Sequence, residues 1–188
     1  LIFYYLTEIL GIKESNIILM GRCVGSGPAV YLASKHNVLS LILISPFKSI
    51  KEAVRTMFPK LNFGAFLQSF VKERFNNYDI IKQVVSPILF LHGKMDNIIP
   101  CEHSIQLIER CTAPAKLVSP HAMSHSRFDF EVDIVSHIKE FLKVFTSIEE
   151  DTNYDSFSDE WDDLGSMDEG VQEQEDVIIP AELFKCPY

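Results

Sequence analysis

Short apolar runs alternate with amphipathic stretches along residues 1–146. The runs are rich in β-branched residues and occupy residues 17–20, 41–44 and 88–91, with a weaker one at 116–119. The amphipathic stretches predict helices at about residues 25–35 and 102–110. Strands that alternate with helices are typical of a parallel sheet with helices on both faces. We therefore expect an α/β fold with a mostly parallel sheet.

The clearest helix is the last one before the C-terminal tail. Apolar residues recur on one helical face from Ile134 to Phe145, so this helix should pack on the sheet. Residues 51–86 differ, because Pro59 and Gly64 interrupt a segment rich in Phe, Lys and Arg. We interpret this segment as a cap-like insert over the site.

The net charge of −9 conceals two regions of opposite sign. Residues 1–148 carry 16 Lys and Arg against 12 Asp and Glu, whereas residues 149–188 carry 14 acidic residues and one base, Lys185. So acidic a composition buries too little apolar surface to offset the entropy of ordering. We therefore predict a folded domain over residues 1–146 and an acidic, largely disordered tail over residues 147–188.

Composition disfavours several classes of protein. No uninterrupted apolar run reaches the length of about 18 residues that indicates a transmembrane helix, and the first residues lack the features of a signal peptide. No basic stripe with interleaved aromatic residues supports nucleic-acid binding. The sequence indicates no cofactor and no metal site, because the cysteines are too few and too scattered for a zinc site or a disulfide scaffold. The four cysteines are Cys23, Cys101, Cys111 and Cys186. Their number and spacing favour reduced thiols and therefore a cytoplasmic protein.

The run Gly-Arg-Cys-Val-Gly at residues 21–25 carries the first candidate for chemistry. It follows an expected strand and opens an expected helix, which is the setting of a Gly-x-Ser-x-Gly nucleophile elbow, here with cysteine in place of serine. We expect this turn to be too tight for a side chain at either glycine, and the nucleophile to adopt a strained conformation. Cys23 is the candidate nucleophile, and the backbone N–H of Val24 is the candidate oxyanion donor. The alternative is a buried cysteine in an elbow that has lost its activity.

The other two members of a hydrolytic triad are expected at the ends of later strands. Asp96 follows the strand at residues 88–91, where a carboxylate can orient an imidazole. His125 lies between the last strand and the last helix. Nucleophile, then acid, then histidine is the chain order that α/β-hydrolases use. Asp96 and His125 therefore complete the predicted triad.

Other residues compete for each of these positions. His121 is a nearby alternative to His125, and Ser26, which lies inside the expected helix, is a weak alternative nucleophile. Asp96 could instead be a turn or capping aspartate of the kind expected at Asp129 or Asp133.

Further motifs make the resemblance to one family specific. They are GRCVGSGPAVYLAS at residues 21–34, Ser-Pro-Phe at 45–47, Ser-Pro-Ile at 86–88, His-Gly at 92–93 and IIPCEH at 98–103. With these motifs, residues 1–146 resemble the α/β-hydrolase domain-containing proteins of the cytosolic protein-depalmitoylase type, especially their protist-like members. The resemblance implies an α/β-hydrolase fold with a thioesterase or serine-hydrolase site. It also implies that Cys23, Asp96 and His125 occupy the triad positions.

The chain departs from this family in three ways. Cys23 replaces serine, and Ala-Met-Ser at residues 122–124 stands where many members have a Gly-rich turn. In the family, further strands precede the elbow, so we expect an α/β-hydrolase domain that is truncated before Leu1. Those strands bring the loop with the second oxyanion donor. They also follow a lipidated cysteine cluster, through which membrane association would occur.

The sequence therefore predicts a cytoplasmic hydrolase that cleaves acyl esters or acyl thioesters with a Cys-His-Asp triad. Its substrate would be an acylated protein or a small ester, and the resemblance implies protein depalmitoylation. The competing interpretation is a catalytically inactive α/β-hydrolase-like protein that binds partners. Trp161 and Leu164 in the acidic tail form an aromatic-x-x-aliphatic pattern, resembling autophagy-receptor motifs, that could bind such a partner by pairing with a sheet edge.

Overall fold

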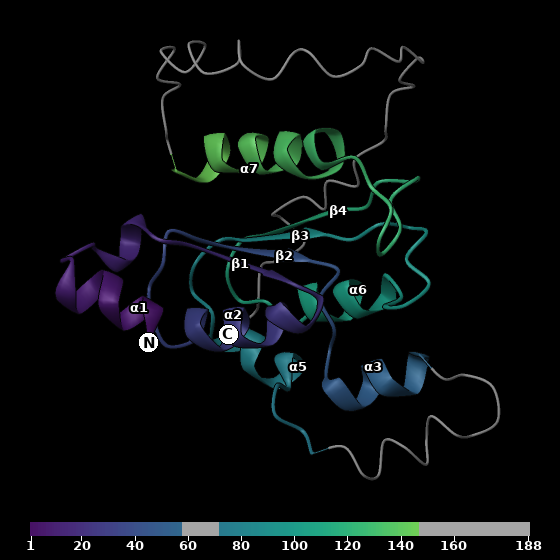
Figure 1. The fold of residues 1–188 in the computed structure, drawn as a ribbon, viewed down its shortest axis with the longest axis horizontal. Coiled ribbons are helices and arrows are strands. Elements are labelled where there is room, and N and C mark those ends of the chain that lie inside the picture. Colours follow the sequence, from purple (N-terminus) through teal and green to yellow (C-terminus); the bar gives the residue numbers. More distant parts are fainter. Residues whose placement is uncertain (58–71, 147–188) are drawn as a thin grey trace.

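The computed structural model describes residues 1–57 and 72–146 of the chain (Figure 1). The acidic tail, with Trp161 and Leu164, and the middle of the predicted cap-like insert lie outside the described residues. No helix within the described ranges has the length and apolar character needed to cross a membrane.

Four parallel strands form one sheet in the order β1-β2-β3-β4. They are β1 (Ile18–Arg22), β2 (Ser40–Ile44), β3 (Ile88–Leu91) and β4 (Ala115–Val118). Each lies within two residues of the strand that its apolar run predicts. The expected parallel sheet is confirmed.

Helices cover both faces of this sheet (Figure 1). On one face lie α2 (Ser26–Ala33), α3 (Ile50–Met57), α5 (Asn77–Ile80) and α6 (Glu102–Ile108), and on the other lies α7 (Ser136–Thr146). Shorter turns complete the described chain: α1 (Ile2–Tyr4), the π-helical turns Tyr5–Ile9 and Glu131–Val135, and the 3-10 turns Glu14–Asn16, Cys23–Gly25 and Ile81–Gln83. The predicted last helix is thus an α-helix preceded by a π-helical turn.

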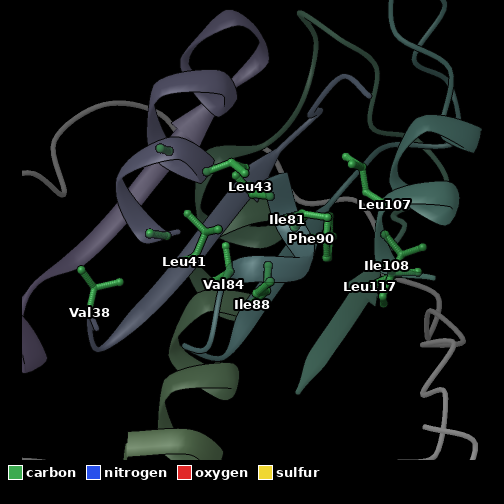
Figure 2. Packing of buried hydrophobic residues seen from close by; sticks show 13 residues of the cluster. Val38, Leu41, Leu43, Ile81, Val84, Ile88, Phe90, Leu107, Ile108 and Leu117 are labelled. Carbon is green, nitrogen blue, oxygen red and sulfur yellow. The ribbon is translucent and has the colours of Figure 1, made fainter. Parts of the chain in front are cut away.

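The core lies on the two faces of β2 and β3, which are buried along their whole length. Alternate residues of a strand point to opposite faces, so Leu43 and Phe90 face α2 and α6 (Figure 2), whereas Ile42 and Leu89 pack with α7 on the other side. Each fully buried side chain of this kind contributes about 1.5–3 kcal/mol. Burial on both faces explains why these strands appear in the sequence as unbroken apolar runs.

The two described ends of the predicted cap-like insert are joined at their base. The Glu73 carboxylate accepts hydrogen bonds from the backbone N–H groups of Ile50 (3.1 Å) and Lys51 (3.3 Å), so it caps the start of α3. Ser49 and Asn76 form an isolated antiparallel bridge beside this contact. Residues 72–76 therefore return to the place from which α3 leaves the domain.

Candidate active site

Cys23 stands at a sharp turn directly after β1. Its φ is +49°, in the left-handed region that costs a residue with a side chain about 1–3 kcal/mol. The chain passes from the extended Arg22 through Cys23 into a 3-10 turn and then into α2. This is the strand–turn–helix geometry of a nucleophile elbow, in which the strained residue presents its side chain at the end of the strand.

The two glycines of the elbow have different roles. A Cβ at Gly21 would lie 2.5 Å from the carbonyl oxygen of Gly25 and 2.8 Å from the Cβ of Ala29, so only glycine fits there. A Cβ at Gly25 would meet no atom within 4 Å, and the φ of Gly25 is −64°, which any residue adopts. The prediction that both positions exclude a side chain is therefore wrong for Gly25. Within the elbow, the backbone strain is confined to Cys23, and the chain is already helical two residues later.

A buried series of hydrogen bonds through Ser26 and Asn77 holds the elbow in place. The Ser26 hydroxyl donates to the carbonyl oxygen of Cys23 (2.6 Å). The Asn77 amide in turn donates to the Ser26 hydroxyl oxygen (3.3 Å) and to the carbonyl oxygen of Phe47 (2.8 Å). Ser26 is fully buried and its proton is engaged, so it holds the turn in place and is not available as a substitute nucleophile.

Asp96 is buried and fully engaged by its surroundings. One carboxylate oxygen accepts from the backbone N–H groups of Ile98 (3.0 Å) and Ile99 (2.8 Å), and the other is bonded to Nδ1 of His125 at 2.8 Å. Burial by itself would raise the pKa of Asp96, but these hydrogen bonds, together with the nearby Ser45 hydroxyl, lower it below its ordinary value. Asp96 is therefore a carboxylate at neutral pH, able to orient the His125 ring and to stabilise its protonated form.

His92 shapes the loop that carries Asp96. Its ring is fully buried, with Nε2 2.7 Å from the carbonyl oxygen of Ile99 and Nδ1 2.7 Å from the hydroxyl oxygen of Ser104. Because a carbonyl only accepts, Nε2 carries the proton, and burial keeps the ring neutral by lowering its pKa. His92 thus fixes Ile99, whose N–H binds Asp96. In the sequence, His92 stands out only as part of the His-Gly motif at residues 92–93, and that motif was the available signal of this role.

The competing residues all have other partners. His121 is exposed, and its Nε2 lies 2.9 Å from the ammonium group of Lys94. Asp129 and Asp133 cap the turn before α7, because Asp129 accepts from the Val132 N–H (2.8 Å) and Asp133 accepts from the Asp129 N–H (2.8 Å). Of these histidines and aspartates, His125 and Asp96 are the pair that the structure brings together.

The elbow and the histidine loop are joined through Arg22. Its guanidinium donates a hydrogen bond to the backbone carbonyl of His125. The Cys23 side chain itself is half-buried against the cluster of Phe47, Ala53 and Ile99. In the part of the chain that the structure describes, no hydrogen bond joins the Cys23 thiol to the His125 ring. The structure therefore bonds the acid to the histidine and the histidine loop to the elbow, whereas the thiol and the imidazole are not in direct hydrogen-bond contact.

Two further properties limit the chemistry of the site. Val24 is the second residue of the turn that begins at Cys23, and N–H groups at the start of a helix have no acceptor within the helix. The Val24 N–H therefore has no acceptor within that turn. Among residues 1–57 and 72–146, no group of three or more His, Cys, Asp or Glu side chains could hold a metal ion.

Among known proteins, the chain is similar in sequence to α/β-hydrolase domain-containing proteins. No protein-family model matches the chain. Alpha/beta hydrolase domain-containing protein 17B from Homo sapiens is 31% identical over 139 residues, which cover 74% of this chain and 44% of the human protein. Alpha/beta hydrolase domain-containing protein 17C from Mus musculus is 29% identical over 132 residues, covering 70% of this chain and 39% of the mouse protein. The chain thus spans less than half the length of these curated relatives.

Solved structures agree on the fold. The monoacylglycerol lipase of Paleococcus ferrophilus superposes with a TM-score of 0.54 at 17% identity, over 77% of this chain and 74% of that one. The esterase domain of a Rhodothermus marinus protein gives a TM-score of 0.53 at 16% identity, over 68% of this chain and 60% of that one. The chain has the α/β-hydrolase fold. The family resemblance and the α/β-hydrolase fold expected from the sequence are thereby confirmed.

Proposed function

We propose that this α/β-hydrolase chain cleaves acyl-ester or acyl-thioester bonds, with Cys23 as nucleophile, His125 as general base and Asp96 as the orienting acid. The observation that carries the proposal is the 2.8 Å hydrogen bond between Nδ1 of His125 and the buried Asp96. This bond fixes the tautomer, because a proton on Nδ1 leaves Nε2 as the basic nitrogen. The strained backbone at Cys23 supports the role of its thiol, since elbows hold their nucleophile in this conformation.

The reaction divides into two steps. In the first, Nε2 of His125 takes the thiol proton, and Cys23 attacks the acyl carbonyl carbon. The Val24 N–H faces the oxyanion that forms, and Asp96 stabilises the imidazolium. The tetrahedral intermediate then collapses, and the leaving thiol or alcohol takes the proton from His125. In the second step, His125 activates a water molecule, which hydrolyses the acyl–Cys23 thioester and regenerates the thiol.

We further propose that the substrate is a protein acylated on cysteine, so that the reaction is depalmitoylation. The support for this finer proposal is the similarity to alpha/beta hydrolase domain-containing proteins 17B and 17C, together with the chemistry of the thiol. Attack of a thiolate on a thioester exchanges one thioester for another, with a leaving thiol whose pKa is near that of a free cysteine, about 8.5. Attack on an oxyester must expel a much more basic alkoxide. The replacement of serine by cysteine therefore favours thioester substrates.

The test measures hydrolysis of a fatty-acyl thioester and of the corresponding oxyester by the purified chain and its variants. Cys23→Ala and His125→Ala should each abolish turnover of the thioester. Asp96→Asn should lower it by about 10,000-fold, the effect of leaving the histidine in the wrong tautomer in a triad of this kind. Matched controls are Cys111→Ala and His121→Ala, which remove the same residue types outside the site and should leave turnover within about twofold.

A second candidate is a catalytically inactive interaction protein. It is favoured by one observation, the absence within the described residues of a hydrogen bond between the Cys23 thiol and the His125 ring. Apo hydrolases often show loose contacts that tighten only with substrate, so this observation does not exclude catalysis. The two candidates differ in one result. If neither substrate is turned over faster by the unmodified chain than by Cys23→Ala, the hydrolase proposal fails and the interaction protein is favoured.

A further inference from the structure

Arg22 makes two contacts with the loop that carries the candidate general base. Its guanidinium donates to the backbone carbonyl of His125, which is 103 residues later in the chain. The same guanidinium lies over the ring of Phe128, with its carbon 5.2 Å from the ring centroid, within the range of a cation–π contact. The side chain of Arg22, the last residue of β1, therefore contacts the loop at two points. One is the His125 carbonyl, inside the turn formed by residues 124–127, and the other is the Phe128 ring, directly after that turn.

The two ends of His125 are thereby held from different parts of the sheet. The ring is bonded to Asp96, which follows β3, and the backbone is bonded to Arg22, which ends β1. Asp96 alone fixes one ring nitrogen but leaves the ring free to swing about that hydrogen bond. The second hold comes from the residue next to Cys23, so it ties the position of the base to the position of the nucleophile.

We propose that Arg22 is a positioning residue that sets the distance and orientation of His125 relative to Cys23. It does not touch the reacting atoms. This inference rests on the proposed function, because it assigns Arg22 a role in the reaction of Cys23 and His125. An arginine suits this position because its planar guanidinium can donate to a carbonyl with its edge while its face lies on an aromatic ring, and a lysine ammonium cannot do both.

The chemical consequence concerns turnover and not substrate binding. A displacement of about 1 Å between reacting groups can cost about 100-fold in rate. We therefore expect Arg22→Ala to lower kcat about 10- to 100-fold with KM within about twofold, and Arg22→Lys to recover only part of the loss. Millimolar guanidinium chloride should raise kcat of Arg22→Ala at least threefold, whereas sodium chloride at the same concentration should not. Phe128→Leu, which keeps the loop apolar but removes the ring, should lie between the unmodified chain and Arg22→Ala.

The matched control is Arg127→Ala. It removes an equal charge from the same loop, and the exposed Arg127 side chain makes no hydrogen bond among the described residues. Its kcat should equal that of the unmodified chain. Equal kcat for Arg22→Ala and the unmodified chain, with both folded by circular dichroism, would overturn the positioning role.

A second measurement separates this inference from the proposed function. The Nδ1 proton of a histidine bonded to a carboxylate gives a far-downfield proton resonance, which Asp96→Asn should abolish. In Arg22→Ala this resonance should broaden through exchange with water, whereas in Arg127→Ala it should stay sharp. If the chain hydrolyses nothing but the resonance responds in this way, the proposed function fails and the positioning of His125 by Arg22 stands. If turnover depends on Cys23 but neither the resonance nor kcat changes in Arg22→Ala, the proposed function stands and the positioning role of Arg22 fails.

Discussion

Replacing His103 by asparagine should make the folded protein less sensitive to acid. His103 is 6% exposed, and its Nδ1 accepts a hydrogen bond from the backbone N–H of Lys48 at 3.0 Å. Burial, and then the charge of Lys48, lower the pKa of His103 from 6.5 to about 4. Asparagine offers an oxygen at a similar place to accept from Lys48, but it does not titrate.

The sign and size of the effect follow from proton binding. Between pH 6.5 and about 4, the unfolded chain binds a proton at His103 and the folded chain does not, so the free energy of unfolding falls as the pH falls through this window. The full difference of about 2.5 pH units corresponds to about 3 kcal/mol, at 1.36 kcal/mol per unit. At pH 7, His103 is neutral in both the folded and the unfolded chain, so this loss of stability is absent.

Urea unfolding of the two proteins at pH 7 and pH 4.5 measures the effect. The unmodified chain should lose about 2–3 kcal/mol more than His103→Asn between these values. His92, whose pKa burial also lowers, is present in both proteins and cancels in the comparison. His121→Asn, a change at an exposed histidine, controls for the loss of a ring from the surface. Identical pH slopes for the unmodified chain and His103→Asn would refute the assignment of this acid sensitivity to His103.

Three further predictions concern the elbow and its thiol. Gly21→Ala should destabilise the fold by about 1–3 kcal/mol in urea unfolding, because its Cβ would overlap the Gly25 carbonyl. Gly25→Ala should change the free energy of unfolding by less than about 1 kcal/mol. Equal effects of the two substitutions would contradict the geometry of the turn. Iodoacetamide at neutral pH should label Cys23 before Cys111, whose pKa burial raises to about 12, and peptide mass spectrometry that finds Cys111 labelled as fast would count against a reactive elbow. Asn77→Ala should lower the free energy of unfolding by about 1–3 kcal/mol, since it leaves the buried Phe47 carbonyl without its donor, and an unchanged midpoint would show that this bond contributes nothing.

The strands and the sharp turn at Cys23 were predictable from the sequence because their signals are local. β2 and β3 are buried on both faces, so residues 41–44 and 88–91 are all apolar and form clear runs in the sequence. The positive φ of Cys23 follows from a Gly-x-x-x-Gly run between a strand and a helix. The role of Gly25 was predicted wrongly, because a sequence pattern does not tell which glycine approaches another atom.

Contacts between distant segments could not be predicted in this way. The bond from Arg22 to the His125 carbonyl depends on the path of a loop that has no regular periodicity. The same holds for His92, whose two ring contacts arise only when α6 packs beside the loop after β3. The choice of Asp96 over Asp129 and Asp133 was supported by its place after a strand, and the structure gives each of the other two a capping partner instead.

The most direct test of the central claim is to trap the acylated enzyme. The chain is mixed with a fatty-acyl thioester, quenched in acid within seconds and digested, and the peptides are examined by mass spectrometry. The account predicts that the acyl group is found on Cys23, that neutral hydroxylamine removes it, and that His125→Ala prevents its formation. Turnover of the thioester with no acyl group on Cys23, or acylation of Cys23 that is equally fast in His125→Ala, would contradict the proposal that Cys23, His125 and Asp96 act as a triad.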